Sequence, residues 1–330
     1  MTTRRIRIEP DAIEIEAIEG ETILQAARRA GVELPYECGW GSCGTCKLTL
    51  VEGEAELIFP EAPAVNTRDA RRGRVLACQC RAISDLIIRR SPGEWAGMPV
   101  RCVEHKATLR NVEMLGPEIR RFTFETAEPA EFLPGQYAIL HLGEKLRRSY
   151  SMCNLPGGNV LQLIAKRYTD GIGSNRLAGM QPGQCITIEA PFGVCTLRRK
   201  PGRKVFVAGG TGISPILSMV SQAAEERMNF AAPVHVIYGA RTPAELAAGD
   251  ILEQAAGRIA NAQYLPVVKD APEGWPYATG LVTDAIAATV SELRSAEFYV
   301  AGPPVMVNAV KALLQSADVP ITQVCYDSFG

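Results

Sequence analysis

The sequence predicts a multi-domain chain that combines α+β and α/β folds. We expect a small β-grasp domain, a six-stranded antiparallel β-barrel and a doubly wound domain with a parallel sheet. Three observations favour this arrangement. A loop rich in glycine and cysteine near residue 40 is flanked by strand patterns, short strands separated by Pro-Gly turns follow, and strands alternate with helices beyond residue 203. Such alternation is typical of a parallel sheet covered by helices on both faces.

The composition is that of an ordinary globular protein with two or three domains. The chain has 330 residues, of which 47% are hydrophobic and 22% charged, and its formal net charge is −1. This balance gives no electrostatic reason to expect binding to nucleic acid or to an anionic membrane. No apolar run reaches the roughly 18 residues of a membrane helix, and the N-terminus lacks the apolar core of a signal peptide. We therefore expect a cytoplasmic protein.

The β-grasp domain is expected at residues 1–92. Apolar and polar residues alternate on both sides of a Glu9-Pro10-Asp11 turn, which is the pattern of a β-hairpin. The expected elements are this hairpin at 4–18, a helix at 22–30, and strands at 47–52 and 85–90. Two prolines and two glycines without periodicity make 91–99 a linker.

Two further domains are expected at 101–199 and 203–330. The barrel strands are expected at 107–114, 119–125, 137–142, 160–167 and 185–189, with a helical turn at 174–180. In the last domain we expect strands at 205–207, 234–238, 263–268 and 298–300, and helices at 214–227, 244–256, 281–290 and 304–316. This alternation predicts a doubly wound parallel sheet.

Three cysteines lie close together on the glycine-rich loop, and a fourth thiol follows at a distance. Cys38, Cys43 and Cys46 have the C-x4-C-x2-C spacing of plant-type [2Fe–2S] ferredoxins, and spacing alone leaves Cys78 and Cys80 open as the fourth ligand. Thiolates are soft ligands that suit iron. A structural zinc site is the alternative, but such sites usually pair two short cysteine knuckles. The loop therefore predicts a one-electron carrier.

The histidines exclude several other metal centres. The chain has three, His105, His141 and His235, and they are far apart in sequence. This spacing argues against a Rieske centre, a carboxylate-bridged di-iron site or a zinc hydrolase. Any oxygen activation is therefore expected on another protein.

Two motifs in the middle domain together predict a flavin site. Arg148-Ser149-Tyr150-Ser151 lies on a predicted strand, and by itself this pattern is typical of any strand. The pattern becomes stronger evidence for a flavin site when it is combined with Gly171-Ile172-Gly173-Ser174. This turn opens a helical segment whose free N–H groups can hold a pyrophosphate. Arg148 can bind the same phosphates as a fork donor, and Tyr150 offers a flat face to an aromatic ring.

Two glycine-rich turns in the last domain predict a dinucleotide site. Gly209-Gly210-Thr211-Gly212-Ile213-Ser214-Pro215 follows a buried strand and opens a helix, and Ala301-Gly302-Pro303-Pro304 repeats this arrangement. Both turns are expected at the carboxyl ends of parallel strands, where doubly wound sheets bind ligands. The first turn departs from the G-x-G-x-x-G pattern, and a glycine-rich turn without a ligand is the alternative.

The order of these motifs resembles the ferredoxin–NADP reductase superfamily over the whole chain. More closely, it resembles the three-domain reductase components of bacterial aromatic-ring-hydroxylating oxygenases and soluble di-iron monooxygenases. In that family a plant-type [2Fe–2S] domain precedes an FAD-binding and an NAD-binding domain. The resemblance implies a monomeric, NADH-dependent flavin iron–sulfur oxidoreductase with a [2Fe–2S] cluster and FAD.

The resemblance also implies roles for particular residues. The family pattern L-x-C-Q selects Cys78, so the cluster ligands would be Cys38, Cys43, Cys46 and Cys78. Tyr150 and Ser151 would be the catalytic residues at the flavin ring. The positions implied in FAD binding are Arg148, Tyr150, Ser151, Ile164, Lys166, Gly171, Gly173 and Ser174. Those implied in NADH binding are Gly210, Thr211, Gly212, Arg241, Gly302 and Pro303. Phe329 resembles family tails that end near the flavin, and an ordinary terminal strand is the alternative there.

Two points concern the coenzyme. Many relatives have cysteine where this chain has Ala301, so a cysteine's polar influence on hydride transfer is absent here. NADPH needs cations for its extra phosphate, whereas NADH usually has a carboxylate at the ribose. Arg241 is the lone candidate cation and the sequence offers no evident carboxylate. The resemblance favours NADH.

The expected function is to convert electron pairs into single electrons. NADH would reduce FAD, and electrons would pass singly through the cluster to an oxygenase component or to a ferredoxin that serves it. The alternatives are a reductase of a di-iron monooxygenase or of a deoxysugar dehydratase, and a non-enzymatic redox carrier or sensor. We expect Trp40, Gly41 and Ser42 at an exposed docking tip. A run of arginines lies shortly before Cys78, and we hypothesise that it binds an acidic face of the oxygenase. The run consists of Arg68, Arg71, Arg72 and Arg74.

Overall fold

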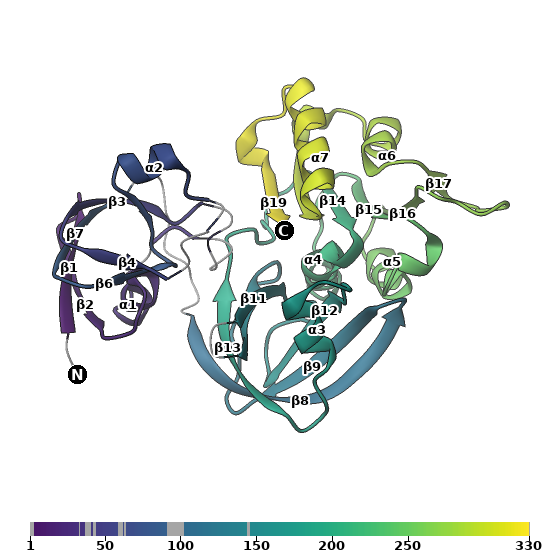
Figure 1. Cartoon of the computed structure of the whole chain (residues 1–330). Coiled ribbons are helices and arrows are strands. Elements are labelled where there is room, and N and C mark those ends of the chain that lie inside the picture. Colours follow the sequence, from purple (N-terminus) through teal and green to yellow (C-terminus); the bar gives the residue numbers. More distant parts are fainter. Residues whose placement is uncertain are drawn as a thin grey trace. The chain divides into compact units, whose positions relative to one another are not determined.

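The chain forms two compact units, Met1–Cys102 and Val103–Gly330. The computed structural model describes residues 3–32, 34–36, 41, 44–58, 62, 64–90, 102–143 and 146–329 (Figure 1). Both domains expected after the linker lie in the second unit. The expected linker itself lies outside the described residues.

The first unit is built on a five-stranded mixed sheet with the order β2-β1-β7-β3-β5 (Figure 1). In this sheet β1 and β7 are parallel and the other neighbours are antiparallel. A small sheet of β4 and β6 and two helices complete the unit. The bounds are β1 Thr3–Glu9, β2 Ile13–Ile18, α1 Ile23–Arg29, β3 Lys47–Glu52, β4 Ala55–Leu57, α2 Thr67–Arg71, β5 Arg74–Leu76, β6 Cys80–Ala82 and β7 Leu86–Arg89.

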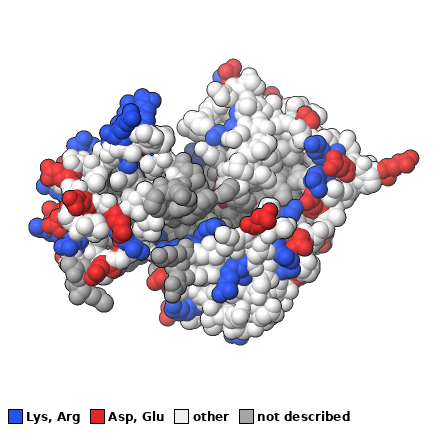
Figure 2. Space-filling view, in the orientation of Figure 1, with Lys and Arg blue, Asp and Glu red and all other residues white. Residues whose placement is uncertain are grey.

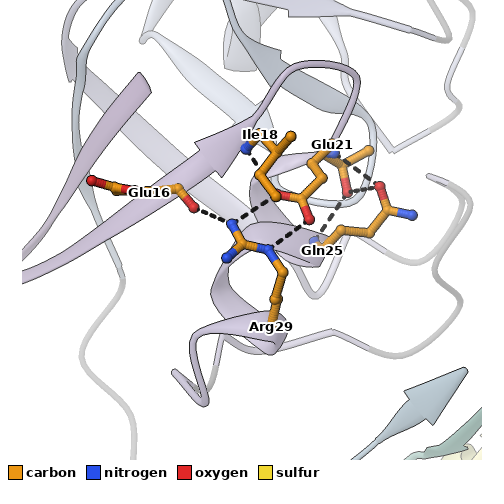
Figure 3. Close-up of polar contacts among 6 residues, drawn as sticks. Glu16, Ile18, Glu21, Gln25 and Arg29 are labelled. Carbon is orange, nitrogen blue, oxygen red and sulfur yellow. Dashed lines mark hydrogen bonds and ion pairs between the residues drawn. The ribbon is translucent and has the colours of Figure 1, made fainter. Parts of the chain in front are cut away.

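Local sequence fixes both ends of α1. The Thr22 hydroxyl accepts a bond from the Gln25 N–H at 3.1 Å, and the Gln25 side-chain oxygen accepts one from the Thr22 N–H at 2.9 Å. This reciprocal pair is a capping box. At the other end Arg29 donates to both carboxylate oxygens of Glu21 and to the Glu16 carbonyl (Figure 3). The apolar face of α1 is thereby held in the core of the first unit.

The second unit begins with a six-stranded antiparallel sheet of order β11-β10-β13-β8-β9-β12. Its elements are β8 Val103–Gly116, β9 Ile119–Thr126, β10 Tyr137–Gly143, β11 Leu146–Ser151, β12 Val160–Lys166, α3 Ile172–Ala178 and β13 Cys185–Phe192. Strand β8 is longer than expected at both ends. Beyond the ends of the named strands, Met152 forms an isolated bridge to Leu163 of β12.

A six-stranded parallel sheet follows, with the order β17-β16-β15-β14-β18-β19 (Figure 1). Its strands are β14 Arg203–Gly209, β15 Val234–Ala240, β16 Ala262–Val268, β17 Ala278–Thr279, β18 Ala296–Gly302 and β19 Val324–Ser328. The helices are α4 Ile213–Glu225, α5 Gly249–Gly257, α6 Val282–Thr289 and α7 Pro304–Ser316. Short 3-10 turns are η1 Gly210–Gly212, η2 Pro243–Glu245, η3 Leu293–Ser295 and η4 Ile321–Gln323.

Alternate residues of the central strands serve two separate cores. Phe206 and Ala208 of β14 pack with α4 and α5, whereas Val205 and Val207 pack with α6 and α7. Successive strand residues point to opposite faces, so a strand buried on both sides is apolar throughout. The doubly wound prediction is confirmed. Among the described residues, no helix is long and apolar enough to cross a membrane.

One helix begins later than the sequence predicted. Residues 244–256 were expected to be one helix, but the chain forms η2 first and α5 starts only at Gly249. Ala248 adopts a left-handed conformation with φ of 55°, which interrupts a right-handed helical path. The Tyr238 hydroxyl lies 3.2 Å from the Ala247 carbonyl and 3.1 Å from the Gly210 carbonyl. A buried tertiary contact therefore holds this turn, and helical periodicity alone gave no sign of it.

Candidate functional site

Two of the four proposed cluster ligands lie within the described residues, and they are in contact. Cys46 directly precedes β3, and Cys78 lies in the turn between β5 and β6. Their sulfur atoms are 3.3 Å apart and both side chains are buried. This separation is well beyond the 2.05 Å of a disulfide bond, and two thiolates this close suit a shared iron. Cys38 and Cys43 lie outside the described residues.

Cys80 differs from Cys78 in its surroundings. Cys80 begins β6, whose backbone pairs with β4. Burial raises the pKa of the Cys80 thiol to about 11, but Cys46 and Cys78 are buried as well, so burial does not separate the candidates. The sulfur in contact with Cys46 is that of Cys78. The Ala77 N–H donates to the Cys46 carbonyl at 3.0 Å and so holds the segment just before Cys78 against the loop. The geometry therefore favours Cys78 over Cys80 beside Cys46.

The described part of the loop fits a tightly wrapped ligand cradle. Gly41 has φ of +99° and is buried, and a Cβ there would lie 3.0 Å from the Ala62 Cβ. Its carbonyl accepts a bond from the Ala64 N–H at 3.1 Å. The expectation of an exposed tip is therefore wrong for Gly41, because its neighbours cover it. The other two residues of that tip lie outside the described residues.

The two flavin motifs of the second unit lie together. Arg148, Tyr150 and Ser151 are on β11, and Gly173 is in the first turn of α3. The Arg148 side chain packs so closely over this turn that a Cβ on Gly173 would lie 2.6 Å from its Cγ. Burial raises the pKa of the Tyr150 phenol to about 12, so the ring stays neutral. An arginine beside the first turn of a helix could hold a phosphate next to an aromatic face.

Ser174 holds the shape of the α3 turn. Its hydroxyl donates to the Gly171 carbonyl at 3.1 Å and accepts from the Tyr168 N–H at 3.1 Å. A Cβ at Gly171 would lie 2.3 Å from the Ser174 hydroxyl oxygen. The serine therefore shapes the turn through its own backbone contacts, which leaves the N–H groups of the turn as the donors for a phosphate.

Sequence reasoning assigned no role to Asp327, the partner of Ser151. The Ser151 hydroxyl donates to an Asp327 carboxylate oxygen at 3.0 Å, although 176 residues separate them. Asp327 lies on β19, where it is paired in register with Ala301, next to the Gly302 turn. This contact joins the flavin motif to the end of the parallel sheet. In the sequence, this contact was indicated only by the resemblance of the tail Tyr326-Asp327-Ser328-Phe329 to family tails that end near the flavin.

The two glycine-rich turns of the parallel sheet pack against each other. A Cβ on Gly212 would lie 2.0 Å from the Ala301 carbonyl oxygen, and one on Gly302 would lie 2.9 Å from the Gly209 carbonyl oxygen. Gly302 also has φ of +153°, which side chains rarely adopt. Their strands, β14 and β18, are neighbours in the sheet. Backbone groups at two adjacent carboxyl ends are therefore brought together, as a dinucleotide site requires.

A cavity of about 640 Å³ opens at these turns. Its wall includes the turn residues Gly209, Gly210, Thr211 and Pro303, and the C-terminal Phe329. The Phe329 N–H donates to the Gly302 carbonyl at 3.0 Å. The size suits a small-molecule ligand, and glycine backbone with apolar cover suits a nucleotide. The C-terminal segment thus forms a strand, β19, and its next residue, Phe329, is part of the cavity wall.

Charged side chains line one side of the cavity. Lys166 of β12 donates to a Glu245 carboxylate oxygen at 2.6 Å, and both residues line the cavity. The sequence had suggested only a flavin contact for Lys166. Arg241 and Lys269 follow β15 and β16, and Arg241 lies 3.8 Å from the Asp270 carboxylate. Glu245 and Asp270 are thus the acidic residues that sequence reasoning missed.

Two serines of α4 fix the parallel sheet to the flavin strands. The Ser218 hydroxyl donates to the Asn154 carbonyl at 2.7 Å, and the Ser214 hydroxyl donates to the Ile164 carbonyl at 3.4 Å. Both serines are buried. Ile164 is itself buried, in the same core cluster as the apolar residues of α4. The nucleotide turn and β12 are therefore held in fixed positions.

Family models match the three parts of the chain in the expected order. A 2Fe-2S iron-sulfur cluster binding domain matches residues 6–82, an oxidoreductase FAD-binding domain matches 106–196, and an oxidoreductase NAD-binding domain matches 206–312. Fold and site thus define a class of protein, a flavin- and iron–sulfur-dependent oxidoreductase that uses a nicotinamide coenzyme. The expected cofactor set is confirmed.

Individual relatives narrow this class. The ferredoxin–NAD(+) reductase component of the alkene monooxygenase system of Xanthobacter autotrophicus is 35% identical, over 94% of this chain and 95% of that protein. The electron transfer component of anthranilate 1,2-dioxygenase from Acinetobacter baylyi is 32% identical, over 94% and 92%. The solved ferredoxin reductase in carbazole 1,9a-dioxygenase matches with a TM-score of 0.88 and 27% identity, over 100% and 99%. The chain belongs to the family of ferredoxin–NAD(P)+ reductase components of oxygenase systems.

Proposed function

We propose that the chain takes hydride from NADH onto FAD in the second unit and sends single electrons through the [2Fe–2S] cluster of the first. The observation that carries this proposal is the 3.0 Å bond between Ser151 and Asp327. It joins the flavin motif to the strand that pairs beside the Gly302 turn. Hydride transfer needs flavin and nicotinamide in contact, and this bond connects the two candidate sites.

The proposed cofactor contacts follow from this arrangement. When bound, FAD accepts a hydride and releases electrons one at a time, and the cluster carries them singly. Ser151 and Tyr150 would orient the flavin ring, Asp327 would hold the Ser151 hydroxyl, and Phe329 would cover the site. The FAD phosphates would be held by Arg148 and the backbone of the α3 turn. Further contacts are proposed for Ile164, Lys166, Gly171, Gly173 and Ser174.

The proposed NADH contacts are the backbone of Gly210, Thr211 and Gly212, with Gly302 and Pro303 at the nicotinamide. Arg241 would lie near the adenosine ribose. Asp270 lies near this arginine, but Lys269 adds a second cation to the cavity wall, so these charges do not select between NADH and NADPH. NADH is proposed as the donor because a relative over most of the chain is a ferredoxin–NAD(+) reductase component.

The proposed cluster ligands are Cys38, Cys43, Cys46 and Cys78. The contact between the sulfur atoms of Cys46 and Cys78 supports the assignment of the last two. We also propose that the first unit is a β-grasp fold and that the antiparallel sheet of the second closes into a barrel. The bridge between Met152 and Leu163 supports that closure, because it joins the residue after β11 to the middle of β12, and these are the two edge strands of the sheet.

The proposed acceptor is an oxygenase component or a ferredoxin that serves it. The reductase component of an alkene monooxygenase system and the electron transfer component of anthranilate 1,2-dioxygenase are 35% and 32% identical to the chain. The similarity therefore concerns the reductase and does not select a substrate of the oxygenase. We propose an aromatic-ring-hydroxylating oxygenase as the first acceptor to test, with a di-iron monooxygenase as the second.

The donor and the route are tested together. The purified holoprotein is titrated anaerobically with NADH and then with NADPH, while flavin absorbance and the paramagnetic signal of the reduced cluster are recorded. We expect NADH to bleach the flavin and to produce the cluster signal, and NADPH, added to a separate oxidised sample, to do so at least about tenfold more slowly. A flavin that NADH leaves oxidised would overturn the proposed function.

A further inference from the structure

Helix α2 of the first unit carries three exposed arginines. Asn66 caps the helix by accepting a bond from the Asp69 N–H at 2.9 Å. Arg68, Arg71 and Arg72 follow, all exposed to solvent. Figure 2 shows Lys and Arg side chains gathered over this helix. We call these three residues the α2 arginine patch.

The patch lacks counter-charges among the described residues. Several other arginines of the unit pair with carboxylates, as in Arg89 with Glu9 at 2.8 Å and Arg90 with Asp11 at 2.6 Å. The acidic residue within α2, Asp69, accepts a bond from Lys47 at 2.8 Å. Within the described ranges no ion pair involves the patch itself. Its positive charge is therefore available to another molecule.

The three arginines bring like charges close together. Arg68 and Arg72 are four residues apart, and like charges at that spacing repel each other on a helix. Arg68 and Arg71 also fall in the last turn of this five-residue helix, where basic side chains are favourable. The helix therefore tolerates the patch, which presents one positive surface.

The patch is tied to the cluster ligands by several short contacts. Lys47, which pairs with Asp69 of α2, directly follows Cys46. Gly73 directly follows the patch in sequence, and its carbonyl accepts a bond from the Leu50 N–H of β3 at 2.8 Å. Strand β5 then runs from Arg74 to Leu76, two residues before Cys78. A protein that binds the patch is thus brought to the edge of the sheet that carries two of the proposed ligands.

We propose that the α2 arginine patch is a docking surface for the protein electron acceptor, and that this acceptor has an acidic face around its electron entry point. The proposal rests on the function proposed above. The first unit has 13 Lys and Arg and 14 Asp and Glu over residues 1–90, so the positive charge is local. A local patch suits a complementary patch on a folded protein better than it suits an extended polyanion.

The physical consequence is electrostatic steering. Complementary charges raise association rates by roughly 10- to 1,000-fold at low ionic strength. At about 0.1 M salt the Debye length is about 10 Å, so the attraction between exposed charges weakens as salt is added. An acceptor that docks on the patch should therefore be reduced quickly at low salt and more slowly at high salt.

The test compares two double variants of the holoprotein with equal charge change. Arg68→Glu with Arg71→Glu alters the patch, and Arg4→Glu with Arg7→Glu alters exposed positions on β1, which lies three strands from β5 in the sheet. The probes are cytochrome b5, an acidic haem protein, cytochrome c, a basic haem protein, and ferricyanide. NADH-driven reduction of each is measured at low and high salt.

We expect the patch variant to reduce cytochrome b5 about tenfold more slowly at low salt and with little salt dependence. The β1 variant should stay within about twofold of the wild type. Replacing both patch arginines by lysine should preserve the rate, because the charge is kept. Unchanged iron–sulfur absorbance and flavin content in every variant show that the fold is intact.

Three results would overturn the proposal. The patch and β1 variants could slow cytochrome b5 reduction equally, or the wild type could reduce cytochrome b5 no faster than cytochrome c at low salt. The patch variant could also lose binding to phosphatidylserine vesicles or duplex DNA while cytochrome b5 reduction is unchanged. Failure of the proposed function is a separate result, since the wild type would then not reduce ferricyanide with NADH.

Discussion

The cluster loop of the first unit and the cavity of the second are both redox sites, but they are assembled differently. The proposed cluster ligands are side-chain thiols, and three of them lie within nine residues, Cys38 to Cys46. The cavity is formed by backbone turns at the ends of β14 and β15 and by side chains from β12, α6 and α7. A site made of one unusual side-chain type can be found by its spacing. A site made of turns from distant strands depends on how the sheets pack.

The largest expected effect concerns the cluster loop. Cys78→Ser should lower the bound iron and the iron–sulfur absorbance at least about tenfold, because a thiolate in contact with Cys46 is lost. Cys80→Ser should keep the cluster, because the sulfur in contact with Cys46 is that of Cys78. Iron content and absorbance spectra measure both. Flavin content serves as the control, and equal loss of iron in the two variants would contradict the ligand assignment.

The second largest effect is expected for a variant that tests whether the cavity depends on close backbone packing. Gly212→Ala would place a Cβ 2.0 Å from the Ala301 carbonyl oxygen, and both turns would have to separate. We expect a rise in the KM for NADH of about tenfold and a loss of about 1–3 kcal/mol in the free energy of unfolding. Ferricyanide reduction and flavin-release melting measure these quantities. Gly257→Ala, with no atom within 4 Å of the new Cβ, is the matched control.

A smaller effect is expected where two segments meet through one hydrogen bond. Asp327→Ala removes the acceptor of the Ser151 hydroxyl, and flavin reduction by NADH should slow by about tenfold. Asp327→Asn keeps an acceptor and should cost less. Stopped-flow absorbance measures the rate. Ser328→Ala, at an exposed position on the same strand, should leave it unchanged, and a similar loss in that variant would remove the specific role of Asp327.

The smallest effect concerns the ion pair at the cavity wall. Lys166→Met should raise the KM for NADH by up to about threefold and change stability by less than about 1 kcal/mol, because the pair is partly exposed. The hydrogen bond from Lys166 lowers the pKa of the Glu245 carboxyl. Its stabilising contribution is thus complete at neutral pH and is lost as the pH falls through that lowered pKa.

Melting curves of wild type and Lys166→Met between neutral and acidic pH test this. The difference in melting temperature should be constant near pH 7 and should shrink in acid. A difference that grows as the pH falls would show that the pair is not the source of the effect.

Much of the fold was predictable because its periodicities are local. The hairpin, α1 and β3 begin and end within about one residue of their expected positions, and α7 matches its expected bounds. Alternation and capping residues act over a few positions, so the sequence contains them. The late start of α5 was missed, because a buried tyrosine from β15 holds the preceding turn.

For the candidate site too, local motifs were predictable from the sequence and contacts between distant residues were not. The sequence by itself determined the three clustered cysteines, the R-x-Y-S strand and the two glycine-rich turns, since each is a short motif whose residue types suit one kind of ligand. Only the tertiary structure decided that Asp327 holds Ser151, that Glu245 pairs with Lys166 and that Asp270 lies beside Arg241. Acidic residues are common along any chain, and they become specific only when packing places one beside a motif residue.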